Sequence, residues 1–397
     1  MRTVAGRRVA VVGGTGFIGS HLTERLVAEG AEVLAVARSA ARVSSLAAVR
    51  HDCTIALADI CDADGMIRVM RRFRPAIVLF LASHPDAGES FGHIAEGMRV
   101  NGLGLINTLQ AAAATECELF VYGDSAKDYG NAQVPYRASQ TAAPVCSYAI
   151  LKSAGWQLCQ LVSAFTGLKT VALRPTFVYG ARQGRNVITH VHECVTAGRP
   201  VRLMGGDQTR DPLYIDDAVD AFVAAACAPA AWGHAIPIGG GQELTVRELC
   251  ETALAAWGAS VPVVSGAEPP RMTEIWRSSS DNADAYRLLG WQPRVSLAEG
   301  LARTIDGWSG RAAITTTATA PAIPRRAGAG AYLLATAPGV VYWMLDRRQG
   351  VERRSVFRGG RRAEDARALA GVTGNGRTAE TEPHPNDTYS PLVGGSM

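Results

Sequence analysis

The chain has 397 residues, of which 47% are hydrophobic and 19% are charged, a composition typical of a soluble globular protein. Its net charge of +4 is small for this length, so we expect no clustered basic face and no nucleic-acid partner. The eight cysteines lack C-x-x-C pairs and regular spacing, which indicates buried thiols in a reducing cytoplasm and no metal site. An early first strand leaves no room for a signal peptide, so we expect a cytoplasmic protein.

The first predicted element is an apolar strand at Val9 to Val12 that ends in a glycine-rich turn. Gly13, Gly16 and Gly19 follow at G-x-x-G-x-x-G spacing, and an apolar helix pattern begins at Phe17. Gly13 allows the sharp turn, Gly16 lets the backbone approach a pyrophosphate, and Gly19 lets the helix pack against the strand. The free N–H groups and the dipole of the helix bind the anion. The stretch therefore predicts a dinucleotide site.

The second predicted strand, Glu32 to Ala37, ends at Arg38. In dinucleotide folds an acidic residue at this point accepts a hydrogen bond from the ribose 2′-hydroxyl, whereas an arginine pairs with a 2′-phosphate. The acid is missing here, and Arg42 lies one helical turn further on. This pattern favours NADP over NAD, although a solvated surface role for Arg38 is the alternative.

Strands and helices then alternate over the first half of the chain. Further strands are predicted at 55–58, 77–81, 119–122 and 171–173, and helices at 17–28, about 90–114 and 147–166. This alternation predicts an α/β fold with a Rossmann-like, doubly wound parallel sheet, whose ligand lies beyond the C-terminal ends of the strands.

Beyond Gly184 the alternation becomes irregular, which indicates a smaller C-terminal α/β substrate lobe. Helices are predicted near 216–228, 245–257 and 297–306. We divide the chain into a Rossmann domain at 1–183, a substrate-binding lobe at 184–311, and a linker and partly disordered tail at 312–397.

The tail contains a charge-free stretch, Ala327 to Leu345, between two arginine pairs. Its length approaches that of a membrane span, but it is rich in Gly and Ala and is interrupted by Pro338. Three alternatives stay open for 327–345: weak membrane association, a docked helical hairpin, or a poorly ordered tail.

A second chemical motif lies at the start of the helix predicted at 147–166. The chain contains three lysines, and one of them, Lys152, follows Tyr148 by four residues, which places both side chains on one helix face. A tyrosine titrates near pH ~10, too high for a base at neutral pH, but a nearby ammonium lowers this value. Tyr148 can then exchange a proton with a sugar hydroxyl or a ketone. A surface pair is the structural alternative.

Ser125 is the third candidate catalytic residue. It follows the strand at 119–122, so we expect it at the edge of the sheet where the cofactor ring lies. A hydroxyl group at this place can hydrogen-bond the reacting oxygen as charge develops on it.

Taken in order, these motifs resemble the extended short-chain dehydrogenase/reductase family, in particular its nucleotide-sugar epimerases, dehydratases and ketoreductases. The resemblance covers about residues 7 to 308 and includes Asn101, Arg174-Pro175 and Tyr179-Gly180. It implies a catalytic triad of Ser125, Tyr148 and Lys152. It also implies the cofactor-binding residues Gly13, Thr15, Gly16, Phe17, Ile18, Gly19, Arg38, Asp59, Ile60, Leu81, Ala82, Ser83, Tyr148 and Lys152.

The resemblance extends to the substrate. The stretch from Gly205 to Asp211 is similar to the family segment whose arginine, here Arg210, pairs with the diphosphate of a nucleotide sugar, and Arg271 resembles the second such arginine. Guanidinium groups suit phosphate oxygens, although each arginine alone would also fit a surface position. The family further implies a homodimer formed through the helices near 90–114 and 147–166.

A departure from the family pattern narrows the reaction. Nucleotide-sugar 4,6-dehydratases carry two acidic residues directly after the catalytic Ser or Thr, but Ala126 and Lys127 stand there in this chain. We therefore expect an NAD(P)-dependent epimerase acting by reversible hydride transfer. The alternatives are an NADPH-dependent reductase of a nucleotide keto sugar and, less favoured, a non-catalytic cofactor-bound structural or sensor protein.

Overall fold

The computed structural model describes residues 2–84, 88–312, 331–334 and 342–345. The chain divides into two compact units, Met1–Gln349 and Gly350–Met397. The second unit lies wholly outside the described residues, as does the disorder expected in the tail.

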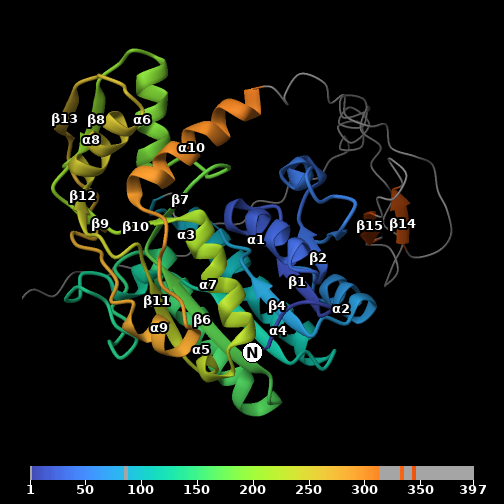
Figure 1. Cartoon of the computed structure of the whole chain (residues 1–397). Helices are drawn as coiled ribbons and strands as arrows, with labels where there is room; N and C mark the ends of the chain where they lie inside the picture. Colours follow the sequence, from blue (N-terminus) through green and yellow to red (C-terminus); the bar gives the residue numbers. More distant parts are fainter. Residues whose placement is uncertain (1, 85–87, 313–330, 335–341, 346–397) are drawn as a thin grey trace, which may run out of the picture. The chain divides into compact units, whose positions relative to one another are not determined.

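A mainly parallel sheet forms the centre of the first unit (Figure 1). Among the described residues it has nine strands in the order β11-β6-β5-β4-β1-β2-β3-β15-β14. The first seven of these have the bounds β1 (Arg8–Val12), β2 (Glu32–Ala37), β3 (Thr54–Leu57), β4 (Ile77–Phe80), β5 (Leu119–Gly123), β6 (Lys169–Pro175) and β11 (Ala235–Ile238). The order reverses between β1 and β4, and this switch point is where doubly wound folds bind their ligands. The predicted fold class is confirmed.

Helices connect the parallel strands and follow them along the chain. Their bounds are α1 (Phe17–Ala28), η1 (Ala40–Leu46), α2 (Ala63–Phe73), α3 (Phe91–Gly97), η2 (Met98–Leu103), α4 (Gly104–Ala113), η3 (Ala126–Tyr129), α5 (Ser147–Thr166), α6 (Val187–Thr196), α7 (Ile215–Cys227), η4 (Pro229–Ala231), α8 (Val246–Ala256), α9 (Ala283–Leu289) and α10 (Leu297–Ala312). The helix predicted at about 90–114 is thus α3, a π-helical turn and α4 in succession.

Both faces of the sheet are covered, because successive residues of each strand point to opposite sides. In β1, Val9 and Val11 join one core cluster, together with α1 and α7. Ala10 and Val12 join a second cluster, together with α2, α4 and α5. A strand that is buried on both faces has a continuous apolar sequence. This is the pattern at Val9 to Val12 from which β1 is predicted.

Short strand pairs build the C-terminal region. They are β7 (Phe177–Tyr179) with β10 (Pro212–Tyr214), β8 (Val201–Met204) with β13 (Val263–Glu268), and β9 (Thr209–Arg210) with β12 (Leu244–Thr245). β11 follows residue 184 in the chain, yet it pairs with β6 in the main sheet. The main sheet thus contains strands from both sides of the domain boundary that we predict at 183/184, and that boundary stays a prediction.

Two strands lie inside the charge-free stretch 327–345. β14 (Ala331–Leu334) and β15 (Tyr342–Leu345) pair in antiparallel fashion, and β15 runs parallel to β3. These residues are strands, so the helical-hairpin alternative is wrong for them; the remainder of 327–345 lies outside the described residues. None of the helices in the described ranges has both the length and the apolar character needed to cross a membrane.

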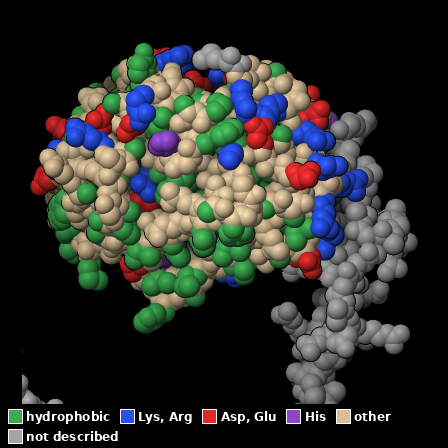
Figure 2. Space-filling model, turned by 90° about the horizontal axis from the view of Figure 1, so that it is seen from below, with side chains coloured by type: hydrophobic (Ala, Val, Ile, Leu, Met, Phe, Trp, Pro, Cys, Tyr) green, Lys and Arg blue, Asp and Glu red, His purple; other side chains and the backbone are tan. Residues whose placement is uncertain are grey.

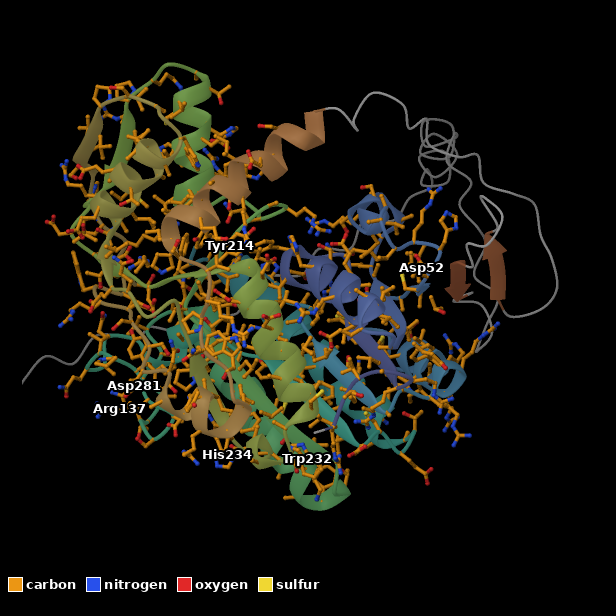
Figure 3. The ribbon with its side chains drawn as sticks, in the orientation of Figure 1. Asp52, Arg137, Tyr214, Trp232, His234 and Asp281 are labelled. Atoms are coloured by element: carbon orange, nitrogen blue, oxygen red, sulfur yellow. The ribbon has the colours of Figure 1, made fainter. Side chains whose placement is uncertain are left out.

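The segment after β5 is fastened to the C-terminal region. Tyr136 N donates to Ser279 O, and Asp281 N donates to Tyr136 O, each at 2.8 Å. Arg137 pairs with Asp281 at 3.1 Å, and Figure 3 shows the two side chains next to each other. These bonds join residues from the two predicted domains. On the face shown in Figure 2, basic and acidic side chains lie interspersed, without a continuous field of either sign among the coloured residues.

Candidate active site

The glycine turn after β1 has no space for larger residues. Gly13 has φ +90°, and a Cβ atom on it would lie 2.7 Å from the backbone nitrogen of Ala82. A Cβ atom on Gly19 would lie 2.1 Å from the carbonyl oxygen of Gly13. Gly16 begins α1 without a side-chain cap, and the first turn of this helix carries no acidic residue. The N-terminus of α1 therefore offers unscreened N–H groups to an anion, and the cradle fits a dinucleotide pyrophosphate.

A cavity of about 1340 Å³ opens at the C-terminal ends of the strands and brings most of the predicted site residues together. Its lining includes Gly13, Thr15, Gly16, Arg38, Asp59, Ile60, Leu81, Ala82, Ser83, Ser125, Arg210 and Arg271. Five predicted residues lie outside the lining: Phe17, Ile18, Gly19, Tyr148 and Lys152. Phe17 and Ile18 pack against the core. The cavity thus joins the predicted cofactor site to the predicted substrate arginines.

The ends of β2 and β3 form one part of the cavity wall. Arg38 and Arg42 both line it. Asp59 accepts a hydrogen bond of 3.0 Å from Cys61 N and lies 3.7 Å from the guanidinium of Arg99. This part of the wall carries one carboxylate and two arginines, and it lies at the ends of β2 and β3, where we expect the adenosine end of the cofactor.

Asn101 fixes the backbone after β4. Its side-chain oxygen accepts a hydrogen bond of 2.7 Å from His84 N and another of 3.2 Å from Ser83 Oγ. Asn101 itself is buried. The π-helical turn that carries Asn101 therefore holds Ala82 and Ser83 at the cavity, on the side where we expect the nicotinamide.

The three predicted catalytic residues come from β5 and α5. Ser125 follows β5 and caps η3, where its hydroxyl oxygen accepts a hydrogen bond of 3.2 Å from Lys127 N. Tyr148 is half-buried in the first turn of α5, two residues after Cys146, which lines the cavity. Lys152 Nζ lies 5.8 Å from the centroid of the Tyr148 ring. The spacing of Tyr148 and Lys152 has placed the two side chains together.

Lys152 is buried and does not line the cavity. Its side chain is 3% exposed, and Nζ donates a hydrogen bond of 2.6 Å to the carbonyl oxygen of Gly123. Burial lowers the pKa of Lys152, whereas the negative charges of Asp124 and Asp128 raise it. The ammonium therefore depends on nearby carboxylates for its charge.

The two predicted substrate arginines differ in their surroundings. Arg210 donates from Nη1 to the carbonyl oxygens of Thr209 and Ile275, at 2.7 and 2.9 Å, and its Nη2 pairs with Glu274. These bonds fix the plane of the guanidinium and leave some of its five N–H groups for a ligand. Arg271 is exposed within the cavity lining.

Sequence reasoning missed several residues of the cavity. Lys127, Arg185, His190 and Arg202 also line it. Arg202 could have been found, because it alternates in β8 with the buried Val201 and Leu203. The others follow strands or lie on the first turns of α6, and no local pattern distinguishes them from surface residues.

Comparison with known proteins adds to this geometry. Residues 9–239 match the family model of the NAD dependent epimerase/dehydratase family. A UDP-glucose 4-epimerase from Mycolicibacterium smegmatis is 33% identical over 309 residues, which cover 75% of this chain and 97% of that protein.

Solved structures are similar over the same share of the chain. The UDP-glucose 4-epimerase of Thermotoga maritima, with UDP-glucose, has a TM-score of 0.71 and 28% identity, over 77% of this chain and 99% of that one. The UDP-glucose 4-epimerase of Thermus thermophilus, in complex with NAD, has a TM-score of 0.69 and 29% identity, over 76% of this chain and 99% of that one.

Proposed function

Because the chain belongs to the NAD dependent epimerase/dehydratase family, we propose that it is a nucleotide-sugar epimerase that inverts a sugar carbon by reversible hydride transfer. One observation carries the proposal. One cavity is lined by a glycine cradle for a dinucleotide, by Ser125 and by two arginines suited to a diphosphate. Lys152 Nζ lies 5.8 Å from the centroid of the Tyr148 ring. This combination serves oxidation and reduction of an alcohol carbon.

Each catalytic side chain has a distinct part. Tyr148 removes the proton from the sugar hydroxyl as the carbon is oxidised and returns it when the carbon is reduced. Ser125 hydrogen-bonds the reacting oxygen while its charge changes. Lys152 supplies the positive charge that favours the phenolate of Tyr148. When bound, a nicotinamide cofactor would supply reversible hydride transfer at the sugar carbon.

The substrate proposed is a nucleotide diphosphate sugar, with UDP-glucose as the first candidate. UDP-glucose accompanies the Thermotoga maritima structure, and three relatives named above are UDP-glucose 4-epimerases. Arg210, oriented by Glu274, and Arg271 would hold the two phosphates, since guanidinium groups bind phosphate oxygens in a bidentate manner.

We propose further that the cavity accepts NADP in preference to NAD. Arg38 and Arg42 line the cavity beside Asp59 and Ile60, and β2 ends in Ala37 rather than in an acidic residue. An arginine here suits a 2′-phosphate. The Thermus thermophilus neighbour carries NAD, so this preference would set the chain apart from it.

The decisive experiment separates epimerase from reductase. The purified protein is incubated with UDP-glucose, and the epimer is measured by NMR while absorbance follows the reduced cofactor. Epimer formation without net cofactor turnover supports the proposal, and Tyr148→Phe should abolish it while cofactor affinity stays. Consumption of NADPH with a keto sugar supports the reductase. Cofactor binding without either reaction supports the non-catalytic alternative.

We also propose a homodimer formed through one apolar surface. Large hydrophobic side chains are exposed on two packed elements: Phe91, Met98, Leu103 and Ile106 along α3 to α4, and Ile150, Leu161 and Phe165 on α5. Exposed apolar side chains in such a group mark an interface. Leu161→Glu should shift the mass measured by light scattering from dimer to monomer; a wild-type monomer would contradict the proposal.

A further inference from the structure

A buried group of charged side chains lies beside Ser125, and the proposed reaction leaves two of them without a role. The side chains of Asp124 and Asp128 are both 0% exposed. Arg174, on β6, donates from Nε to Asp124 Oδ2 at 2.8 Å, and its Nη2 lies 3.3 Å from Asp128 Oδ2. One guanidinium therefore faces two carboxyl groups.

Three of the four oxygens of the two carboxyl groups accept no hydrogen bond from the described residues. Among the described residues, no donor makes a hydrogen bond to Asp124 Oδ1 or to either side-chain oxygen of Asp128. The two side chains lie within hydrogen-bonding reach of each other. Two facing carboxylates repel, whereas one proton between them converts the contact into a hydrogen bond.

Electrostatics agrees with a retained proton. Burial, and then the charge of Asp124, raises the pKa of Asp128 to about 9. Burial also raises the pKa of Asp124, but Arg174 opposes this shift, so Asp124 is the member that ionises first. The titratable or charged side chains facing the pair are Tyr122 on β5, Tyr129 on η3, Lys152 and Cys159 on α5, and Arg174 on β6.

The charge balance connects this pair to the catalytic lysine. With one proton on the pair, Asp124 balances Arg174 and the charge of Lys152 has no full counter-charge. When that proton leaves, Asp128 supplies the second negative charge, and the buried group of four becomes neutral. Both carboxyl groups act on Lys152 and favour its charged form. The second negative charge therefore adds to that of Asp124 and further favours the ammonium form of Lys152.

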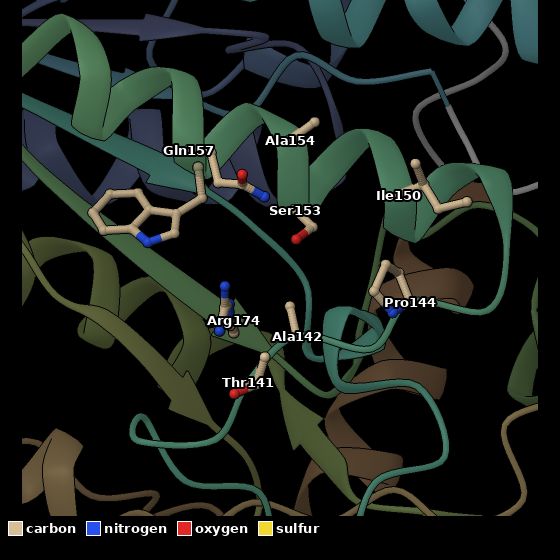
Figure 4. Close-up of a pocket in the computed structure, with 9 residues that line it drawn as sticks. Thr141, Ala142, Pro144, Ile150, Ser153, Ala154, Gln157 and Arg174 are labelled. Carbon is tan, nitrogen blue, oxygen red and sulfur yellow. The ribbon is translucent and has the colours of Figure 1, made fainter.

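A second pocket borders this group at Arg174. The pocket has a volume of about 440 Å³, lies between residues 141–144 and α5, and is bordered by Arg174. Figure 4 shows Arg174 between Thr141 and Ala142 on one side and Ser153 on the other. Its lining shares no residue with that of the cofactor cavity. Arg174 is therefore the member of the group that borders a pocket separate from the cofactor cavity.

We propose that Asp124 and Asp128 share one proton at neutral pH and release it as the pH rises, so that the catalytic ammonium of Lys152 stays charged into the alkaline range. Asp124 and Asp128 are positioning residues in this scheme, because they act through Lys152 and not on the substrate. The link to catalysis rests on the proposed function, whereas the shared proton does not.

Infrared spectroscopy tests the proton directly. The wild-type protein at neutral pH should show the carbonyl stretching band of a protonated, buried carboxyl group, and the band should disappear as the pH passes about 9. The isosteric variant Asp128→Asn should lack it. A wild-type spectrum without this band, or an unchanged band in Asp128→Asn, overturns the proposal even if the enzyme proves inactive on every sugar.

The pH profile tests the effect on Lys152. In Asp128→Asn, the alkaline limb of kcat should move to lower pH by about one unit relative to the variant's own neutral plateau, because the second negative charge never forms. Asp217→Asn is the control. Asp217 is a buried carboxylate on α7 that accepts hydrogen bonds from Arg294 N and Val295 N, so its loss should lower stability without moving the limb. An unmoved limb in Asp128→Asn, or an equal move in the control, refutes the role in catalysis.

Discussion

Replacement of Gly13 by alanine tests the cofactor cradle most sharply. Gly13 has φ +90°, and a Cβ atom would meet Ala82 N at 2.7 Å and the carbonyl carbon of Leu81 at 2.9 Å. Both atoms belong to the backbone, so no side-chain rotation can relieve the contact. A non-glycine residue in such a conformation costs about 1–3 kcal/mol. If the loop relaxes to avoid this cost, its N–H groups leave the positions that hold the pyrophosphate.

The expected result of Gly13→Ala is a loss of cofactor affinity of roughly 5- to 100-fold, since 1.4 kcal/mol corresponds to a factor of ten. Gly30→Ala is the matched control: Gly30 has φ +78°, and the nearest atom to its added Cβ would be Ala5 Cβ at 3.9 Å. It carries the same kind of backbone strain without the contact at the cavity. Calorimetric titration with NAD and NADP measures affinity, and thermal unfolding measures stability. Unchanged affinity in Gly13→Ala, or an equal loss in Gly30→Ala, would refute the assignment of the cradle.

Three further changes test other parts of the site. Arg38→Asp should weaken NADP binding by roughly tenfold and NAD binding less, because a charge-assisted bond to the 2′-phosphate is lost; equal losses in titration would contradict the NADP preference. Arg210→Met should raise KM for the nucleotide sugar by about tenfold with cofactor affinity unchanged, and adding Glu274→Gln should restore stability but not KM; restored KM in the double variant would show a merely structural arginine. For Asp128, the folded-state pKa of about 9 lies above that of the unfolded chain, so its proton stabilises the fold at low pH and this stability falls as the pH rises from about 4 to about 9. Denaturant titrations should therefore show that the free energy of unfolding of Asp128→Asn rises relative to that of the wild type as the pH rises. If the two free energies follow parallel curves against pH, the pKa of Asp128 is not shifted.

Features that depend on local sequence could be predicted from the chain alone. The strand, glycine turn and helix from Val9 to Ala28 appear with the predicted order, because each step follows from apolar periodicity and glycine spacing. The four-residue separation of Tyr148 and Lys152 fixes their common helix face for the same reason. Both predictions needed no knowledge of distant residues.

Features that depend on distant contacts could not be predicted. β11 is the edge strand of the main sheet, but it is four residues long and contains Pro237. A proline argues against a central strand but is tolerated in an edge strand. The strand β11 could therefore be predicted only if its position at the edge of the sheet were already known. Asp128 looks like a solvated loop residue in the sequence. Its burial against Arg174 follows only from the pairing of β5 with β6, which brings together segments that are far apart in the chain.

The position of Asp128 also bears on whether this chain could eliminate water from a sugar. Elimination needs an acid and a base that reach the sugar, and nucleotide-sugar 4,6-dehydratases carry two acidic residues directly after the catalytic Ser or Thr, where this chain has Ala126 and Lys127. Asp128 is the next acidic residue, but its side chain is 0% exposed, pairs with Arg174 and does not line the cavity. It cannot replace the missing acid, because its carboxyl group is fully buried against Arg174, whereas Tyr148 is only half-buried. The same burial that retains a proton on Asp128 at neutral pH excludes it from dehydration, which agrees with the proposed hydride transfer in which Tyr148 exchanges a single proton.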